Sequence, residues 1–99
     1  MKTLLEIEQY AQKHFVPIAR KDFVDFFKKL IIDNNYHEIL EIGSAIGYSA
    51  IKMALVDDGI KVTTIERDEN RYREAVKNIE KSKLNDRIMI ERLCDMEWG

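Results

Sequence analysis

Short apolar runs rich in β-branched residues alternate with amphipathic helical patterns through the second half of the chain. The runs at 38–42, 61–66 and 88–93 predict three strands. A helix is expected at 48–56, and another after Asp68, a residue that caps helix N-termini well. Strands and helices in this order predict parallel strands with right-handed crossovers. We therefore expect an α/β fold, half of a doubly wound sheet, with ligands at the C-terminal ends of the strands.

Two amphipathic helices are expected before the first strand, at 3–14 and 20–33. Pro17 separates them, because a proline disfavours helical geometry in the residue before it. The apolar stripe of the second helix includes an aromatic cluster, which we interpret as core or interface rather than a platform for stacking bases. The cluster consists of Phe23, Phe26 and Phe27.

Length and charge limit the classes of function. The 99 residues suffice for a single domain, 1–99, and 16 basic against 18 acidic residues give a net charge of −2. This balance does not indicate an electrostatic nucleic-acid binder. A lone cysteine, Cys94, cannot form an internal disulfide, so a reducing, cytoplasmic location is expected. No apolar run approaches the roughly 20 residues that span a membrane, so no membrane partner is expected.

A glycine-bearing turn at 41–49 links the first strand to the following helix. Gly43 permits a tight turn, and Gly47 lets a ligand or the next helix come close. Glu66 ends the second strand, near the roughly 20-residue offset at which an acid reaches an adenosine ribose. A carboxylate can accept from two vicinal hydroxyls. Asp95, beyond the third strand, could reach an adenine amino group.

The turn narrows the kind of nucleotide. A dinucleotide fingerprint starting at Gly43 would need glycines where the chain has Ala45 and Tyr48, which disfavours a nicotinamide cofactor. A phosphate-binding P-loop would need lysine before a serine or threonine after the second glycine, and Gly47-Tyr48-Ser49 does not match. An adenosine ligand without a pyrophosphate remains, and S-adenosylmethionine fits this description.

The segment 41–50, Glu-Ile-Gly-Ser-Ala-Ile-Gly-Tyr-Ser-Ala, and the later Thr-Ile-Glu-Arg at 64–67 resemble the class I O-methyltransferases related to catechol and caffeoyl-CoA methyltransferases. Residues 10–18 and 74–79 extend this similarity to the bacterial tRNA 5-hydroxyuridine methyltransferases. The resemblance implies a Rossmann-like fold and methyl transfer from S-adenosylmethionine to a hydroxyl oxygen. The implied acceptor is tRNA or a small hydroxylated molecule, and the complete enzyme is expected to use a divalent metal such as Mg²⁺.

The resemblance also implies roles for individual residues. Glu66 would bind the ribose hydroxyls, Arg67 would lie beside the adenine, Asp95 would contact the adenine edge and Ala19 would lie at the pocket mouth. The methionine portion of the cofactor would be held by Glu41, Gly43, Ser44, Gly47 and Ser49.

Structural alternatives exist for five of these residues. The turn at Gly43 and Gly47 could be needed only for packing. Glu41 could serve only to hydrogen-bond the glycine loop, Ser49 could bond local backbone, and Glu66 could be a solvated strand-end acid. A group of basic residues could contact tRNA phosphates, although a solvated helix face is the simpler interpretation. These residues are Lys77, Lys81, Lys83 and Arg87.

The family's metal ligands and substrate-facing residues lie beyond its fourth strand, so we expect no catalytic or metal-binding residue in this chain. The chain is expected to be the N-terminal half of the fold and inactive alone. The alternative is a binding module, because Ile39, Leu40 and Ile42 would lie on an open sheet edge, which favours self-association.

Overall fold

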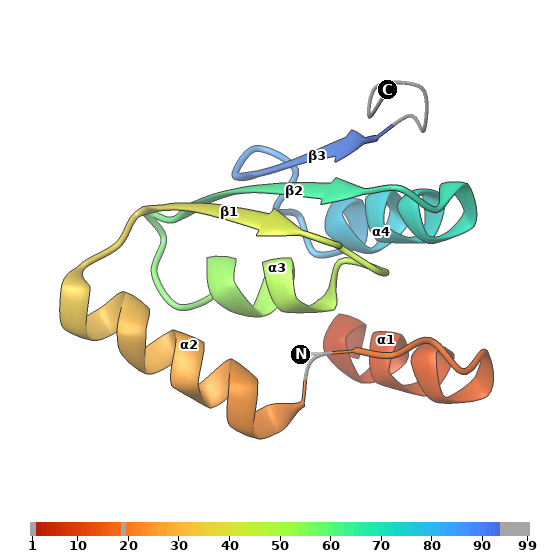
Figure 1. The fold of residues 1–99 in the computed structure, drawn as a ribbon, viewed down its shortest axis with the longest axis horizontal. Coiled ribbons are helices and arrows are strands. Elements are labelled where there is room, and N and C mark those ends of the chain that lie inside the picture. The colour runs from red at the N-terminus through yellow and green to blue at the C-terminus, as the bar shows by residue number, and fades with distance from the viewer. Residues whose placement is uncertain (1, 19, 94–99) are drawn as a thin grey trace.

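Two helices precede three strands that alternate with two further helices (Figure 1). The computed structural model describes residues 2–18 and 20–93. No helix in these two ranges is long and apolar enough to cross a membrane. The elements are α1 (Lys2–Lys13), α2 (Lys21–Asn34), β1 (Glu38–Ile42), α3 (Tyr48–Ala54), β2 (Lys61–Glu66), α4 (Glu69–Lys81) and β3 (Ile88–Arg92).

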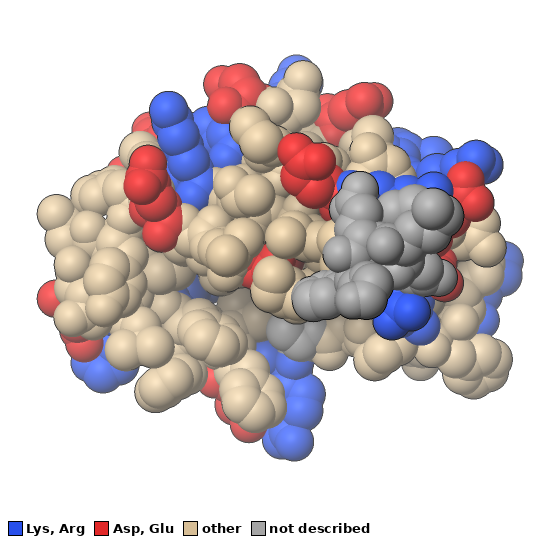
Figure 2. All heavy atoms as spheres, turned by 45° about the horizontal axis from the view of Figure 1, so that its top comes forward, with Lys and Arg blue, Asp and Glu red and all other residues tan. Residues whose placement is uncertain are grey.

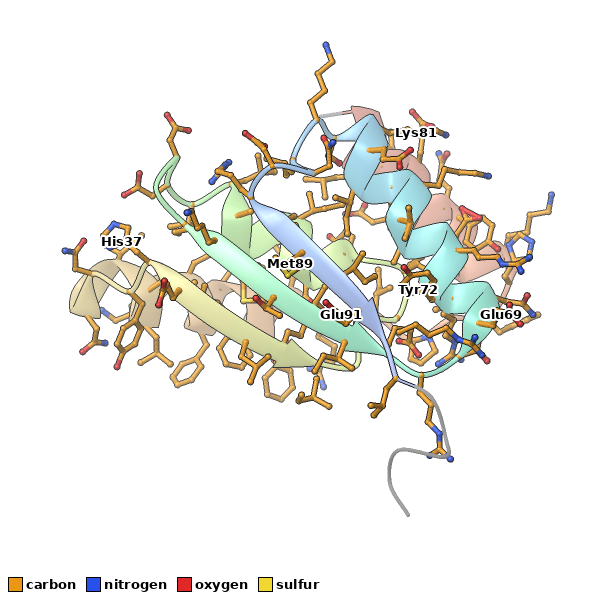
Figure 3. All side chains as sticks on the ribbon, turned by 90° about the horizontal axis from the view of Figure 1, so that it is seen from above. His37, Glu69, Tyr72, Lys81, Met89 and Glu91 are labelled. Atoms are coloured by element: carbon orange, nitrogen blue, oxygen red, sulfur yellow. The ribbon has the colours of Figure 1, made fainter. Side chains whose placement is uncertain are left out.

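The three strands form one parallel sheet in the order β1-β2-β3. Leu40 pairs with Thr63, which in turn pairs with Met89. The helices lie on one side of this sheet, and Figure 3, seen from above, shows the strands in front of them. This arrangement confirms the predicted parallel topology and the helix–helix–βαβαβ order.

The core lies between the sheet and the helices on its covered side. Alternate residues of β2 face this side, so Val62, Thr64 and Glu66 are buried. Ile51 of α3 packs against these strands, and Ile7 reaches the same core from α1. α3 therefore forms the centre of the helical layer.

The opposite face of the sheet is exposed and carries three large apolar side chains. Leu40 and Ile42 of β1 are 66% and 71% exposed, and Met89 of β3 is 61% exposed. Figure 2 shows a broad area of uncharged side chains on this side, with acidic and basic groups interspersed around it. Among the described residues no strand pairs with the outer edge of β1.

The expectation that the aromatic cluster of α2 belongs to the core is wrong. Phe23, Phe26 and Phe27 are exposed, and the buried residues of α2 are Val24 and Ile31. α2 lies on the helical side of the sheet beside α3 (Figure 1), and its main contacts are with α3, so only a narrow stripe of it is buried. The interface interpretation of the three phenylalanines stays a prediction.

Arg87 does not lie on a helix face. It lies before β3, where its Nη1 donates to the carbonyl oxygens of Ala54, Asp57 and Ile60 at 2.9, 2.9 and 3.1 Å. The arginine therefore holds the end of α3 and the turn that leads into β2. It is a structural cation, which corrects its assignment to a solvated or RNA-binding surface.

Candidate functional site

The glycine-bearing loop is fastened to the end of β2. The N–H groups of Gly43 and Ser44 both donate to the carbonyl oxygen of Ile65, at 2.8 and 3.1 Å. Gly43 and Gly47 have φ angles of 89° and 87°, in the region that favours glycine. A Cβ on Gly43 would meet no atom within 4 Å, whereas a Cβ on Gly47 would lie 3.4 Å from the Ala75 carbonyl oxygen. Gly43 thus leaves room for a ligand, and Gly47 lets α4 approach.

A hollow of about 220 Å³ opens beside this loop at the C-terminal end of β1. It is smaller than the roughly 300–1,000 Å³ of a complete small-molecule pocket, so it would enclose one part of a larger ligand. A larger hollow of about 600 Å³ lies at the opposite ends of the strands, where α/β folds do not place their ligands. The 220 Å³ hollow is lined by Pro17, Ile18, Glu41, Gly43, Ser44, Ala45, Tyr48 and Ser49.

Glu41 is the centre of a hydrogen-bond network beneath the hollow. Its carboxylate accepts from Ser49 Oγ and, at 2.7 Å, from Thr64 Oγ1. Thr64 Oγ1 also lies 2.6 Å from Ser44 Oγ. Because a carboxylate only accepts and Thr64 has one hydroxyl proton, Ser44 donates to Thr64. The Ser44 and Ser49 protons therefore point into the protein, and Ser49 bonds a side chain rather than local backbone.

Glu66 ties two loops together. Its Oε1 accepts from the Ala45 amide at 2.7 Å, and its Oε2 accepts from the amides of Arg67 and Asp68 at 3.0 and 2.8 Å. The residue is only 7% exposed, so its interpretation as a solvated strand-end acid is wrong. A carboxylate has about four acceptor positions, and these amides use all but about one of them. One hydroxyl of a ligand can therefore be accepted without breaking an amide bond.

Tyr48 joins the start of α3 to α1. Its hydroxyl donates to Glu8 Oε2 at 2.5 Å, and the residue is 7% exposed. Burial, together with the hydrogen bond to the negative Glu8, raises the pKa of Tyr48 to about 12. Across the loop, Asn78 of α4 donates to the Ile46 carbonyl oxygen at 2.8 Å. The loop is thus held by β2, α1 and α4.

The structure brings most of the predicted site residues together. Glu41, Gly43, Ser44 and Ser49 line one hollow, while Gly47 instead faces α4. Glu66 lies under the same loop, followed by Arg67. Ala19 and Asp95 lie outside the described residues.

Sequence reasoning did not single out Thr64, Glu8 or Asn78 as parts of the site. The alternation of β2 places Thr64 on the same face as Glu66, which is a signal for its burial. The contacts of Glu8 and Asn78 join residues 40 and 32 positions apart, and no local pattern marks such pairs. In the described part of the chain, no group of three or more His, Cys, Asp or Glu residues could hold a metal.

Residues 1–95 match the O-methyltransferase family. The chain belongs to this family. It is similar to a Staphylococcus aureus protein described as a caffeoyl-CoA O-methyltransferase, with 37% identity and a TM-score of 0.87 over 91% of this chain and 43% of that one. It is also similar to an O-methyltransferase of Bacillus cereus solved in complex with SAH, with 30% identity and a TM-score of 0.83 over 99% of this chain and 46% of that one.

These similarities confirm the Rossmann-like fold of this O-methyltransferase chain. The Streptomyces achromogenes O-methyltransferase TomG, solved with SAM, shares 19% identity at a TM-score of 0.79, over 93% of this chain and 43% of that one, which supports the fold alone. The chain spans less than half the length of each of these structures. The matched part corresponds to the N-terminal half of the fold.

Proposed function

We propose that this chain is the cofactor-binding half of an S-adenosylmethionine-dependent O-methyltransferase. The observation that carries the proposal is the loop at Gly43, which is open to a ligand and fastened by Glu66 at the C-terminal ends of β1 and β2. Ligands bind in this position in open α/β sheets. Family membership and the Bacillus cereus relative, which was solved with SAH, support the same ligand.

The hollow suits the methionine end of the cofactor. Gly43 leaves its backbone accessible, and Glu41 provides a half-buried carboxylate that attracts an ammonium group. Ser44, Gly47 and Ser49 shape this end of the site through the loop and the Glu41 network. The bound cofactor supplies an electrophilic methyl group on its sulfonium. The chain's own residues bind and orient it.

The ribose and adenine would lie toward β2 and the residues that follow it. Glu66 retains about one acceptor position for a ribose hydroxyl, because three amides occupy the others. Three further contacts are proposed. Arg67 would lie beside the adenine, Asp95 at the adenine edge and Ala19 at the pocket mouth.

The described residues do not fit the Mg²⁺ that the resemblance implies, since they contain no cluster of ligands for it. No catalytic step is therefore assigned to these residues, and we propose that the 99-residue chain alone does not turn over.

The lone cysteine and the lack of a long apolar run are consistent with the proposed cytoplasmic location.

The cofactor proposal is tested by calorimetric titration with S-adenosylhomocysteine. We expect saturable binding by the wild-type chain, weakened about tenfold or more in Glu41→Gln, because the amide keeps hydrogen-bonding capacity but loses the charge that attracts the ammonium. Glu38→Gln, an exposed change on the same strand, is the matched control and should bind normally. Absence of binding by a folded wild-type chain would refute the proposal.

For the acceptor we propose the 5-hydroxyuridine of tRNA, on the resemblance at 10–18 and 74–79. The 37% identity to the Staphylococcus aureus protein makes a small hydroxylated molecule the second candidate. Fluorescence anisotropy with an anticodon stem–loop carrying 5-hydroxyuridine, compared with the same RNA carrying uridine, separates them. Tighter binding of the hydroxylated RNA supports tRNA, whereas equal binding of the two RNAs argues against recognition of the 5-hydroxyl by this chain.

A second proposal, self-association through the β1 edge, rests on the exposure of Leu40 and Ile42 at an edge that pairs with no described strand. Light scattering over a concentration series should show a mass above that of the monomer. Leu40→Lys should reduce it, whereas Met89→Lys, on the same face but on β3, should not. A monomer at all concentrations would contradict the proposal.

A further inference from the structure

One wall of the hollow comes from outside the glycine-bearing loop. Pro17 and Ile18, which follow α1, line it together with Tyr48 and the loop. The N–H of Val16 donates to the Ala11 carbonyl oxygen at 2.9 Å, so the segment leaves α1 along a fixed path. The position of this wall therefore depends on the position of α1.

Three kinds of contact hold α1 in place. Ile7 and Ala11 are buried in the core, which attaches the helix but does not fix its rotation or translation finely. The hydrogen bond from Tyr48 to Glu8 is directional and partly buried. An ion pair between Glu6 and Lys81, at 3.8 Å, also joins α1 to the rest of the fold, but both side chains are exposed.

Tyr48 therefore belongs both to the lining of the hollow and to the attachment of α1. It lines the hollow together with Pro17 and Ile18, and its hydroxyl is bonded to the helix that these two residues follow. Tyr48 is 7% exposed as a whole residue and its hydrogen bond to Glu8 is partly buried, so water competes for this bond less than it would for an exposed pair.

We propose that Tyr48 is a positioning residue for cofactor binding: through Glu8 it fixes α1, and α1 fixes the Pro17–Ile18 wall over the hollow. The proposal rests on the proposed function, because it assumes that this hollow holds the cofactor. Without the hydroxyl, the wall would be less ordered before binding, and the ligand would have to order it, which lowers affinity.

The test combines S-adenosylhomocysteine titration with hydrogen exchange at the hydrogen-bonded amides of His14 and Val16. Tyr48→Phe removes one oxygen and keeps the ring. We expect it to raise the Kd about three- to tenfold and to speed exchange at both amides. Glu8→Ala should have the same two effects, and the double variant should be no worse than either single one, because the pair acts as a unit.

Two further variants separate positioning from general stability. Glu8→Gln keeps an acceptor for the Tyr48 hydroxyl and should bind close to normally. Glu6→Ala removes the exposed ion pair of the same helix and should change neither the Kd nor the exchange. Thermal unfolding of each variant shows that it is folded at the titration temperature.

Two outcomes are decisive. If the wild-type chain binds and Tyr48→Phe binds equally well with unchanged exchange, the inference is wrong while the proposed function stands. If the folded wild-type chain does not bind, the proposed function fails, and the role of Tyr48 in cofactor binding fails with it. Faster exchange in Tyr48→Phe would then show only that the hydroxyl holds α1.

Discussion

Oε1 of Glu66 accepts a 2.7 Å hydrogen bond from the amide of Ala45, which joins the end of β2 to the loop that follows β1. Ala45 has a φ of 49°, a left-handed conformation that an L-residue with a Cβ adopts at a cost. The carboxylate stabilises this conformation and at the same time occupies the position assigned to ribose binding. Glu66 therefore serves both the fold of the loop and the proposed ligand.

Glu66→Gln should lower the free energy of unfolding by roughly 2–4 kcal/mol, because the new amide N–H faces backbone donors and the charge that strengthens the remaining bonds is lost. Urea denaturation measures this change. Glu69→Gln, an exposed change in the first turn of α4, should cost less than about 1 kcal/mol. Equal stability of the two variants would show that the amide contacts of Glu66 contribute little.

Gly43→Ala and Gly47→Ala should have similar effects on stability but different effects on binding. Both glycines have φ near 90°, so alanine costs roughly 1–2 kcal/mol at either position. The new methyl group at Gly43 enters open space beside the hollow, whereas at Gly47 it contacts Ala75. Titration should therefore show weaker S-adenosylhomocysteine binding in Gly43→Ala than in Gly47→Ala. Equal Kd values would argue against ligand approach at Gly43.

Arg87→Met should lower the free energy of unfolding by about 2–3 kcal/mol, since it removes a charged donor from three carbonyl oxygens and keeps an apolar stem. Arg73→Met breaks only an exposed ion pair with Glu69 and should cost less than about 1 kcal/mol. Chemical denaturation compares them. A loss in Arg87→Met no larger than that in Arg73→Met would contradict the structural role of Arg87.

The strands and helices could be predicted closely because their signals are local. β2 has the predicted bounds, Lys61–Glu66, and Asp68 caps α4 by accepting from the Arg71 amide at 2.9 Å. Small differences arise at the ends: α3 stops at Ala54 and β3 at Arg92. Helix and strand termini depend on the hydrogen bonds of the next segment rather than on residue type.

The side-chain partners could not be predicted, because they depend on which elements meet in space. The spacing of Gly43 and Glu66 indicated a common site, but not that Glu66 would turn inward to bind three amides. The apolar stripe of α2 indicated a core, yet Phe23 is exposed, because α2 packs mainly against α3 and buries only a narrow stripe with Val24 and Ile31. Periodicity identifies an apolar face, but not what covers it.

Alkaline pH should weaken the link between α1 and α3. The pKa of Tyr48 in the fold is about 12, above its ordinary value of about 10, so the folded state binds the phenol proton more tightly than the unfolded state. This contribution to stability is fully present below pH 10 and is lost as the pH rises through 12. The free-energy difference between the wild-type chain and Tyr48→Phe should therefore fall by about 2 kcal/mol between pH 9 and 12. The same comparison is made between Glu8→Gln and the double variant Glu8→Gln/Tyr48→Phe, which both lack the negative charge beside residue 48. Here the free-energy difference should fall by less over the same pH range. An equal fall would show that burial alone raises the pKa of Tyr48.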